Sequence, residues 1–300
     1  MKIKPPRLSQ GEGIGVIAPA GPVTQEDIEQ GISLLESLGF EVVLSSHLYE
    51  RDRYLAGSDG KRLHDLHSMF QNRKVRAIFC ARGGYGSMRL LEAVDYELVR
   101  KNPKIIVGYS DVTALLLAVY NKTGLVTFHG PAVKDLDAKN REDIDFLLSL
   151  LSSEIGKSVS LAQGEVIRPG KAEGVVVGGN LSLICNLIAT PFMPSLKGAI
   201  VFIEEKDEPL YRLDRMMTYL KLSGVLDGCV GVVGGEFLGC GENSSLLRLM
   251  DEKLSYLSVP IFCGLPSGHG PRNMPIPIGV RGMLDTENKV FSIVESCVSS

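Results

Sequence analysis

The sequence predicts an α/β protein, with a mostly parallel sheet layered between helices in the N-terminal half and a mixed, barrel-like sheet in the C-terminal half. Short apolar runs alternate with stretches whose apolar residues recur at helical spacing, and parallel strands need such crossover helices. The runs are rich in Val and Ile throughout, which is typical of strands buried on both faces. The second half has more strands per helix, and its tail at 279–293 has the pattern of an antiparallel hairpin.

The first strand is expected at 14–19, where an apolar run ends at Pro19 and Gly21. A helix follows, because Thr24 stands three residues before Asp27 in a relative of the capping box and apolar residues then recur until Gly39. The same alternation predicts strands at 41–44, 75–81, 104–108 and 125–129, and helices at 60–72, from about 87, at 111–122 and at 141–152.

Periodicity is lost over 153–172, a stretch rich in Ser, Gly and charge. With 300 residues the chain is about twice as long as a typical single domain. We therefore expect an N-terminal α/β domain at 1–155, a linker at 156–172 and a C-terminal domain at 173–300. The predicted strands of the C-terminal domain are 173–178, 198–204, 228–234, 259–264, 277–284 and 289–295, and its helices are 180–188, 211–223 and 243–257.

Composition limits the function classes. Hydrophobic residues make up 44% and charged residues 22% of the chain, which is typical of globular proteins, and the net charge of −3 provides no field that attracts phosphates. We expect neither nucleic acid nor a membrane as a partner. The N-terminus lacks the apolar run of a signal peptide, so a soluble cytoplasmic protein is expected. The six cysteines occur singly and the phosphate-binding motifs are missing, so neither a metal nor a cofactor is expected.

Ser110 is the most prominent candidate for chemistry. It lies where the apolar strand at 104–108 turns into a helix, which is the context of a nucleophile elbow. Backbone N–H groups at the start of that helix can stabilise an oxyanion. The full G-x-S-x-G pattern fails because position 112 is Val, and serine is also common as a helix cap. Both interpretations remain open.

Among the five histidines, His269 and His129 are the candidates for a base or a binding group. His269 lies in a loop dense in Gly and Pro, which implies an unusual backbone path. His129 ends a predicted strand, where the edge of a parallel sheet places it near a site. His47, His64 and His67 lie in polar or charged surroundings and are interpreted as solvated surface residues.

A carboxylate that orients the base is available in Glu204, the first acid at the end of the predicted strand 198–204. Glu205, Asp207 and Glu208 compete with it as solvated loop acids. Ser110, Glu204 and His269 follow the order nucleophile, acid, base that α/β-hydrolase sites also use.

Two glycine-rich turns can bind an anion through their N–H groups. Arg82 in the first turn can hold a substrate carboxylate in a bidentate contact, and Asn180 in the second lies at a helix start. Both are candidates for substrate binding, and tight turns or helix caps are the alternatives.

Seven short motifs together resemble the L,D-carboxypeptidase family, the murein tetrapeptide carboxypeptidase group of serine peptidases. They occur in the family's order over nearly the whole chain: Ile17-Ala-Pro-Ala-Gly, Ala81-Arg-Gly-Gly-Tyr-Gly, Gly108-Tyr-Ser-Asp, Phe128-His-Gly-Pro, Gly178-Gly-Asn-Leu, Glu204-Glu-Lys-Asp-Glu-Pro-Leu-Tyr-Arg-Leu-Asp-Arg and Gly268-His-Gly.

The resemblance implies a catalytic triad at the interface of the two domains, with Ser110 as nucleophile, Glu204 as acid and His269 as base. It also implies an oxyanion hole formed by the backbone N–H groups of Gly84 and Asp111. Family members remove the terminal D-alanine from murein tetrapeptide during cell-wall recycling, without a cofactor, and the resemblance suggests a homodimer.

The sequence departs from the family at 205 and 206, where Glu and Lys replace the expected Asp and small apolar residue, so the choice of substrate stays open. One alternative is the microcin self-immunity type, which cleaves a peptide-nucleotide. A nucleobase favours aromatic surfaces for stacking, and the chain has no Trp and only 6% aromatic residues. A second alternative is a non-catalytic ligand-binding protein with a cleft between two α/β domains.

Overall fold

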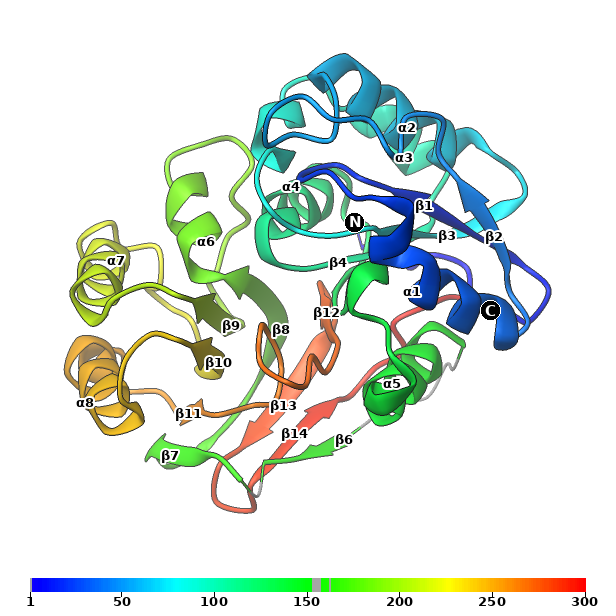
Figure 1. Cartoon of the computed structure of the whole chain (residues 1–300). Helices are drawn as coiled ribbons and strands as arrows, with labels where there is room; N and C mark the ends of the chain where they lie inside the picture. Colours follow the sequence, from blue (N-terminus) through cyan, green and yellow to red (C-terminus); the bar gives the residue numbers. More distant parts are fainter. Residues whose placement is uncertain (1, 153–157, 162) are drawn as a thin grey trace.

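The computed structural model describes residues 2–152, 158–161 and 163–300 of the chain. It contains two sheets with helices packed against them (Figure 1). The α/β architecture is confirmed, with a largely parallel sheet in the N-terminal half and a mixed sheet in the C-terminal half.

The N-terminal sheet has the strand order β12-β5-β4-β3-β1-β2, and its strands are parallel except β12. Its strands are β1 (Gly13–Ile17), β2 (Glu41–Leu44), β3 (Val75–Cys80), β4 (Ile105–Gly108), β5 (Thr127–His129) and β12 (Ile276–Ile278). Its helices are α1 (Gln25–Ser37), α2 (Asp59–Gln71), α3 (Tyr96–Lys101), α4 (Thr113–Thr123) and α5 (Arg141–Ser152). Apolar residues of α2, α3 and α4 join one core cluster and those of α1 and α5 join another, so helices cover both faces of the sheet.

The C-terminal sheet has the order β6-β14-β13-β8-β9-β10-β11-β7, in which β8 to β11 run parallel. Its strands are β6 (Ser158–Ser160), β7 (Glu165–Arg168), β8 (Lys171–Asn180), β9 (Ala199–Lys206), β10 (Gly231–Leu238), β11 (Ile261–Cys263), β13 (Arg281–Asp285) and β14 (Val290–Ile293). Its helices are α6 (Leu181–Leu187), α7 (Leu210–Leu222) and α8 (Asn243–Leu254). The two outermost strands, β6 and β7, are consecutive in the chain. Because five residue steps span at most about 17 Å, the sheet must curl to bring its edges near one another, as Figure 1 shows.

The two halves share their apolar core. One cluster combines Leu116 of α4 with Val177 of β8 and Leu213 of α7, all of them almost completely buried. The chain also returns from the C-terminal sheet to add β12 beside β5. As a result, the carboxyl ends of β4 and β9 and the loop before β12 lie close together, and this is where the candidate site forms.

Three expectations need correction. Residues 158–160 and 165–168, expected within a linker, form the edge strands β6 and β7, which are too short to give a clear periodic signal. The strand expected at 277–284 is two strands in different sheets, separated at Gly279. There φ is +94° and an added Cβ would lie 2.4 Å from the Tyr120 ring. The helix expected from about 87 is a short 3-10 turn (Ser87–Leu90), and helix α3 follows it without having been expected. The predicted boundary at 155–156 lies outside the described residues.

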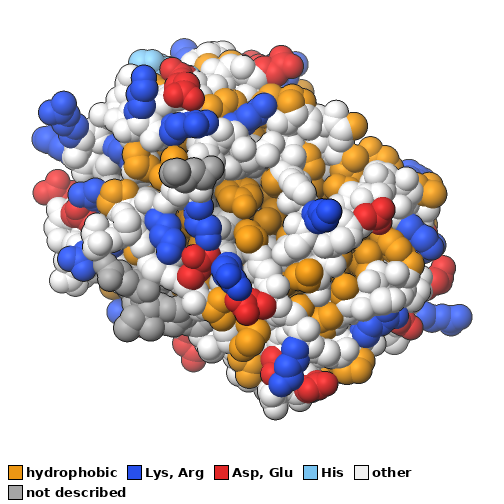
Figure 2. Space-filling model, turned by 180° about the vertical axis from the view of Figure 1, so that it is seen from behind, with side chains coloured by type: hydrophobic (Ala, Val, Ile, Leu, Met, Phe, Trp, Pro, Cys, Tyr) orange, Lys and Arg blue, Asp and Glu red, His pale blue; other side chains and the backbone are white. Residues whose placement is uncertain are grey.

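The surface agrees with the small net charge, because basic and acidic side chains are interspersed over the face shown in Figure 2. Within 2–152, 158–161 and 163–300, no helix combines the length and the apolar character needed to cross a membrane.

Candidate active site

Ser110 begins a short 3-10 turn (Ser110–Val112) between the end of β4 and the start of α4. Its φ is +59°, a left-handed conformation that non-glycine residues rarely adopt and that costs on the order of 1–3 kcal/mol. A helix N-cap normally has an extended backbone and accepts a hydrogen bond from the first turn. Neither feature is found at Ser110 in the described chain, so the helix-cap interpretation is wrong.

The glycine-rich turn after β3 packs directly on Ser110. A Cβ added to Gly83 would lie 2.7 Å from the Ser110 Cβ and 2.9 Å from its Oγ, so the turn needs glycine to approach so closely. The Asp111 carboxylate accepts a 2.8 Å hydrogen bond from the Ser87 N–H, and the Ser87 hydroxyl donates to the Asp111 carbonyl. These bonds join the turn to the segment that carries Ser110.

An oxyanion hole is expected from two backbone N–H groups near Ser110. The backbone N–H groups of Gly84 and Asp111 donate no hydrogen bond to any residue that the structure describes. Gly84 lies in the same cavity as Ser110 and has a φ of +112°, which favours glycine.

His269 and Glu204 form a pair that links the loop before β12 to β9. Nδ1 of His269 lies 2.7 Å from Oε2 of Glu204, whose side chain is completely buried. Burial raises the pKa of the Glu204 carboxyl, and the hydrogen bond from His269 opposes that shift. Gly268 permits the contact, because an added Cβ would lie 2.8 Å from the same carboxylate oxygen.

Ser110 and His269 line one cavity of about 320 Å³. Its other lining residues are Arg82, Gly83, Gly84, Tyr109, Lys134, Asp135 and Lys206. The structure therefore brings Ser110, His269 and Glu204 together, with Glu204 buried behind the imidazole. In the described residues, no group of three or more His, Cys, Asp or Glu side chains is arranged to hold a metal ion.

Comparison with known proteins agrees with this arrangement. Residues 14–130 match the model of the LD-carboxypeptidase N-terminal domain, and residues 173–284 match that of the LD-carboxypeptidase C-terminal domain. The chain belongs to the LD-carboxypeptidase family. It is thus an enzyme, a serine carboxypeptidase as expected, and the alternative of a non-catalytic binding protein is wrong.

Relatives of this LD-carboxypeptidase extend over its full length. It is 36% identical to a probable murein peptide carboxypeptidase of Bacillus subtilis, over 100% of this chain and 96% of the relative. It is 31% identical to the murein tetrapeptide carboxypeptidase of Pseudomonas aeruginosa, over 91% and 92%. The microcin C7 self-immunity protein MccF of Escherichia coli is 29% identical, over 98% and 96%.

Solved structures show the same fold. The MccF-like protein from Bacillus anthracis superposes with a TM-score of 0.92 at 30% identity and covers 98% of this chain and 99% of its own. The muramoyltetrapeptide carboxypeptidase from Oxalobacter formigenes gives a TM-score of 0.85 at 29% identity, over 96% and 100%.

The two residues expected to bind substrate have different surroundings in this LD-carboxypeptidase. Arg82 lines the cavity, and its guanidinium donates a 3.2 Å hydrogen bond to the Pro22 carbonyl. Asn180 is buried away from the lining. Its amide donates to Glu205 at 2.8 Å, and its carbonyl oxygen accepts from the Leu183 N–H at the start of α6. Asn180 therefore caps a helix and holds Glu205 in place.

The three acids that compete with Glu204, namely Glu205, Asp207 and Glu208, have different surroundings. Glu205 was expected in solvent but is buried, where it accepts hydrogen bonds from Asn180 and from the N–H and hydroxyl groups of Ser182. Asp207 is exposed, and Glu208 pairs with Arg212 at the surface. Of the acids in this segment, Glu204 alone is hydrogen-bonded to a histidine in the described residues.

His129 is buried beneath the site. Its ring contacts Phe202 at a centroid distance of 5.0 Å and Tyr109 at 6.0 Å, and Tyr109 in turn contacts His269 at 4.9 Å. Burial and the nearby His269 lower the pKa of His129 to about 3, so the imidazole is neutral. Its role is to pack against Tyr109, which contacts His269. His47 lies elsewhere, with Nδ1 2.8 Å from the buried Asp65.

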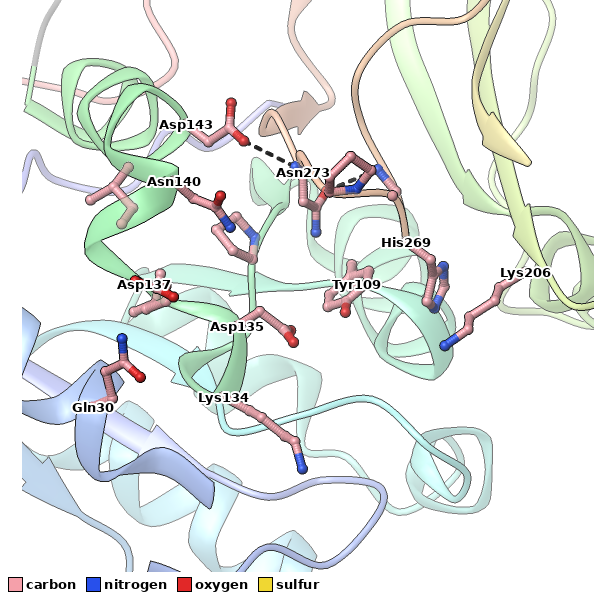
Figure 3. Close-up of a pocket in the computed structure, with 16 residues that line it drawn as sticks. Gln30, Tyr109, Lys134, Asp135, Asp137, Asn140, Asp143, Lys206, His269 and Asn273 are labelled. Carbon is pink, nitrogen blue, oxygen red and sulfur yellow. Dashed lines mark hydrogen bonds between the residues drawn. The ribbon is translucent and has the colours of Figure 1, made fainter. Parts of the chain in front are cut away.

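Four lining residues were not expected from the sequence, namely Tyr109, Lys134, Asp135 and Lys206. Two of them had a local signal, because Tyr109 precedes Ser110 and Lys206 follows Glu204 by two positions on one strand. Lys134 and Asp135 lie in a 3-10 turn (Val133–Asp135) whose sequence has no feature that places it near Ser110. A second cavity of about 440 Å³ continues from the first and shares these four residues and His269 with it (Figure 3).

Proposed function

We propose that this enzyme is an L,D-carboxypeptidase that releases the C-terminal D-alanine of murein tetrapeptide by means of a Ser110-His269-Glu204 triad. The observation that carries the proposal is the 2.7 Å contact of His269 with buried Glu204 beside a cavity that also contains Ser110. The relatives named for murein peptides support the substrate class.

The Glu204 contact at Nδ1 leaves Nε2 of His269 to accept the Ser110 proton. The Ser110 oxygen then bonds to the scissile carbonyl carbon, and the N–H groups of Gly84 and Asp111 stabilise the resulting oxyanion. His269 returns the proton to the leaving amine as the carbon–nitrogen bond breaks, which releases D-alanine and leaves an acyl-enzyme. Water activated by His269 hydrolyses that ester and restores the Ser110 hydroxyl.

A carboxypeptidase must recognise a free terminal carboxylate. Arg82 suits this role, because its guanidinium lines the cavity beside Gly83 and Gly84 and its hydrogen bond goes to an uncharged carbonyl. A planar guanidinium can hold both oxygens of the carboxylate at once.

Cleavage of a peptide-nucleotide is the second candidate, favoured by the close similarity to the MccF-like structure. A nucleobase binds best between aromatic faces. Among the residues that line the two cavities in the described chain, Tyr109 and His269 are the aromatic ones, and they contact each other. The murein peptide therefore remains the preferred substrate.

The test follows the product mass after incubation with L-Ala-D-Glu-diaminopimelate-D-Ala. The wild-type enzyme should release one alanine, and Ser110→Ala should lower kcat at least about 1,000-fold. Ser46→Ala, at an exposed serine away from the cavity, is the matched control and should retain full activity. An inactive wild type, or an active Ser110→Ala variant, would contradict the proposal.

We further propose that the enzyme works in the cytoplasm as a homodimer, as its resemblance to the family suggests. Light scattering of the purified protein should give twice the mass of one chain, and a monomer at micromolar concentration would contradict the dimer. Fractionation of the native cells should recover the activity in the cytoplasm.

A further inference from the structure

Lys206 lies at the boundary of the two cavities beside the candidate triad. It lines the 320 Å³ cavity that contains Ser110, and it also lines the 440 Å³ cavity, which shares His269 with the first. Figure 3 shows Lys206 next to His269, with Lys134 farther away across the pocket. A substrate that occupies both cavities must therefore pass close to the Lys206 ammonium.

Strand geometry explains why Lys206 faces this space. Successive side chains of a strand point to opposite faces, so residues two apart share a face. Glu204 and Lys206 are two apart at the end of β9, and Glu204 meets His269 on the cavity side. Glu205 points the other way and is held by Asn180. The lysine that departs from the family pattern is thus the residue that reaches the site.

The charges around the cavity leave Lys206 able to bind an anion. The 320 Å³ cavity is lined by the cations Arg82, Lys134 and Lys206 and by the carboxylate of Asp135. The 440 Å³ cavity adds the carboxylates of Asp137 and Asp143, of which Asp143 is paired with Arg272. Lys134 is already paired with Asp27.

Within the described residues, the ion pair that Lys206 forms is weaker than the pair between Lys134 and Asp27. Its ammonium lies 3.9 Å from a carboxylate oxygen of Asp207, a side chain that is 70% exposed. Pairs of this kind contribute little because water competes for both groups. A substrate carboxylate can therefore replace Asp207 as the partner at small cost.

We propose that Lys206 is a specificity-determining residue that binds a carboxylate of the substrate. This inference rests on the proposed function, and it assigns a role to a residue outside the triad. The tetrapeptide offers three carboxylates, at its C-terminal D-alanine, on its third residue when that is diaminopimelate, and on its D-glutamate. One of them forms a charge-assisted hydrogen bond with the Lys206 ammonium.

The test measures kcat/KM for release of the C-terminal residue, which is D-alanine or, from the amidated peptide, D-alaninamide, by the wild type, Lys206→Met and Lys206→Arg. Lys197→Met, at an exposed lysine that forms no ion pair in the described chain, is the control. Four peptides serve as probes: the parent, and three that each lack one carboxylate. These carry a C-terminal amide, lysine as the third residue, or D-isoglutamine as the second.

On the parent peptide, Lys206→Met should lower kcat/KM by about 10- to 100-fold, while Lys206→Arg and Lys197→Met should stay within about threefold of wild type. The loss should disappear on the one peptide that lacks the carboxylate bound by Lys206, which identifies that carboxylate. Equal losses on all four peptides, or no loss on the parent, would overturn the inference. Unchanged thermal unfolding of the variants would show that the fold is intact.

A binding measurement separates this inference from the proposed function. Calorimetric titration of the parent peptide into Ser110→Ala and Ser110→Ala/Lys206→Met needs no turnover. If the wild type releases no alanine, the proposed function fails, and a 10- to 100-fold weaker binding by the double variant would still support the role of Lys206. Equal binding by both proteins would overturn it.

Discussion

The close approach between Gly83 and Ser110 gives the glycine-rich turn a functional role at one position. The backbone of Gly83 passes so near to Ser110 that even a methyl group would displace the serine side chain. Gly83 does not have a positive φ, so alanine at this position causes no backbone strain. The close contacts of the added methyl group are with the Ser110 side chain.

Gly83→Ala should therefore lower kcat by about 100-fold, since a displacement of about 1 Å at a reacting atom has an effect of that size. The unfolding temperature should change little. Gly60→Ala is the matched control, because an added Cβ at this position in α2 meets open space and should stabilise the helix by about 0.5–1 kcal/mol. Steady-state kinetics and thermal unfolding of both variants test the prediction, and a fully active Gly83→Ala would contradict it.

The individual candidates could be found from sequence where the signal was local. Ser110 and Glu204 each follow an apolar strand, and His269 lies in a loop of Gly and Pro, so short patterns were enough to select them. The hydrogen bond between Asn180 and Glu205 could not be predicted, because the two residues lie 25 positions apart in the chain. The sequence does not indicate that the two side chains satisfy each other in the interior.

Helix α1 and the turn at 133–135 are coupled by charge next to the site. Asp27 completes the capping box of α1 with Thr24 and also pairs with Lys134 from the turn. The hydrogen bond from Lys134 and that from the Thr24 N–H lower the pKa of Asp27 from 3.8 to about 2. Because the pKa in the folded state is lower than in the unfolded chain, this carboxylate stabilises the fold above pH 3.8, and the contribution is lost as the pH falls through about 2.

Lys134→Met should move the pKa of Asp27 back toward its ordinary value. An NMR titration of the Asp27 carboxyl group would measure the shift directly, with Lys139→Met, at an exposed neighbouring lysine, as the control. The variant should also lose less stability than wild type between pH 3.8 and about 2. A carboxyl that titrates near 2 in both Lys134→Met and wild type would show that the ion pair is not the cause.

Most helices and strands could be predicted from their own sequence, and the exceptions have a common cause. The strand expected at 277–284 has a continuous β pattern, but Gly279 turns the chain against Tyr120 of α4, which is remote in sequence. The edge strands β6 and β7 acquire their conformation by pairing with β14 and β11. In each case the partner, and not the local pattern, decides the structure.

The candidate site depends on contacts between the two halves of the chain. Ser110 comes from the N-terminal sheet, while Glu204 and His269 come from the C-terminal half. The loop that carries His269 is anchored to α5 of the N-terminal half through Asp143, whose side chain is 3% exposed. The Asp143 carboxylate accepts hydrogen bonds from the Arg272 guanidinium. It also accepts one at 3.0 Å from the Asn273 N–H, which Figure 3 shows.

This anchor reaches the imidazole in two steps. The Asn273 side-chain oxygen accepts a 3.0 Å hydrogen bond from the N–H of Gly268, the residue that precedes His269. Removal of the Asp143 carboxylate leaves the Asn273 N–H without a hydrogen-bond acceptor. It also leaves the Arg272 guanidinium with the exposed Glu142 as its ion-pair partner. The loop should then move more freely, although Ser110, Glu204 and His269 are all still present.

Asp143→Ala should therefore lower the free energy of unfolding by about 1–3 kcal/mol and should also reduce kcat, because His269 spends less time aligned with Ser110. Asp145→Ala is the matched control. It removes a carboxylate from the same helix whose pair with Arg141 is exposed, so stability should change by less than about 0.5 kcal/mol and kcat should not change. Denaturant unfolding and steady-state kinetics of both variants decide the matter. If Asp143→Ala loses stability but keeps the wild-type kcat, the anchor serves the fold alone, and the position of His269 is fixed by Glu204 and Gly268 without help from α5.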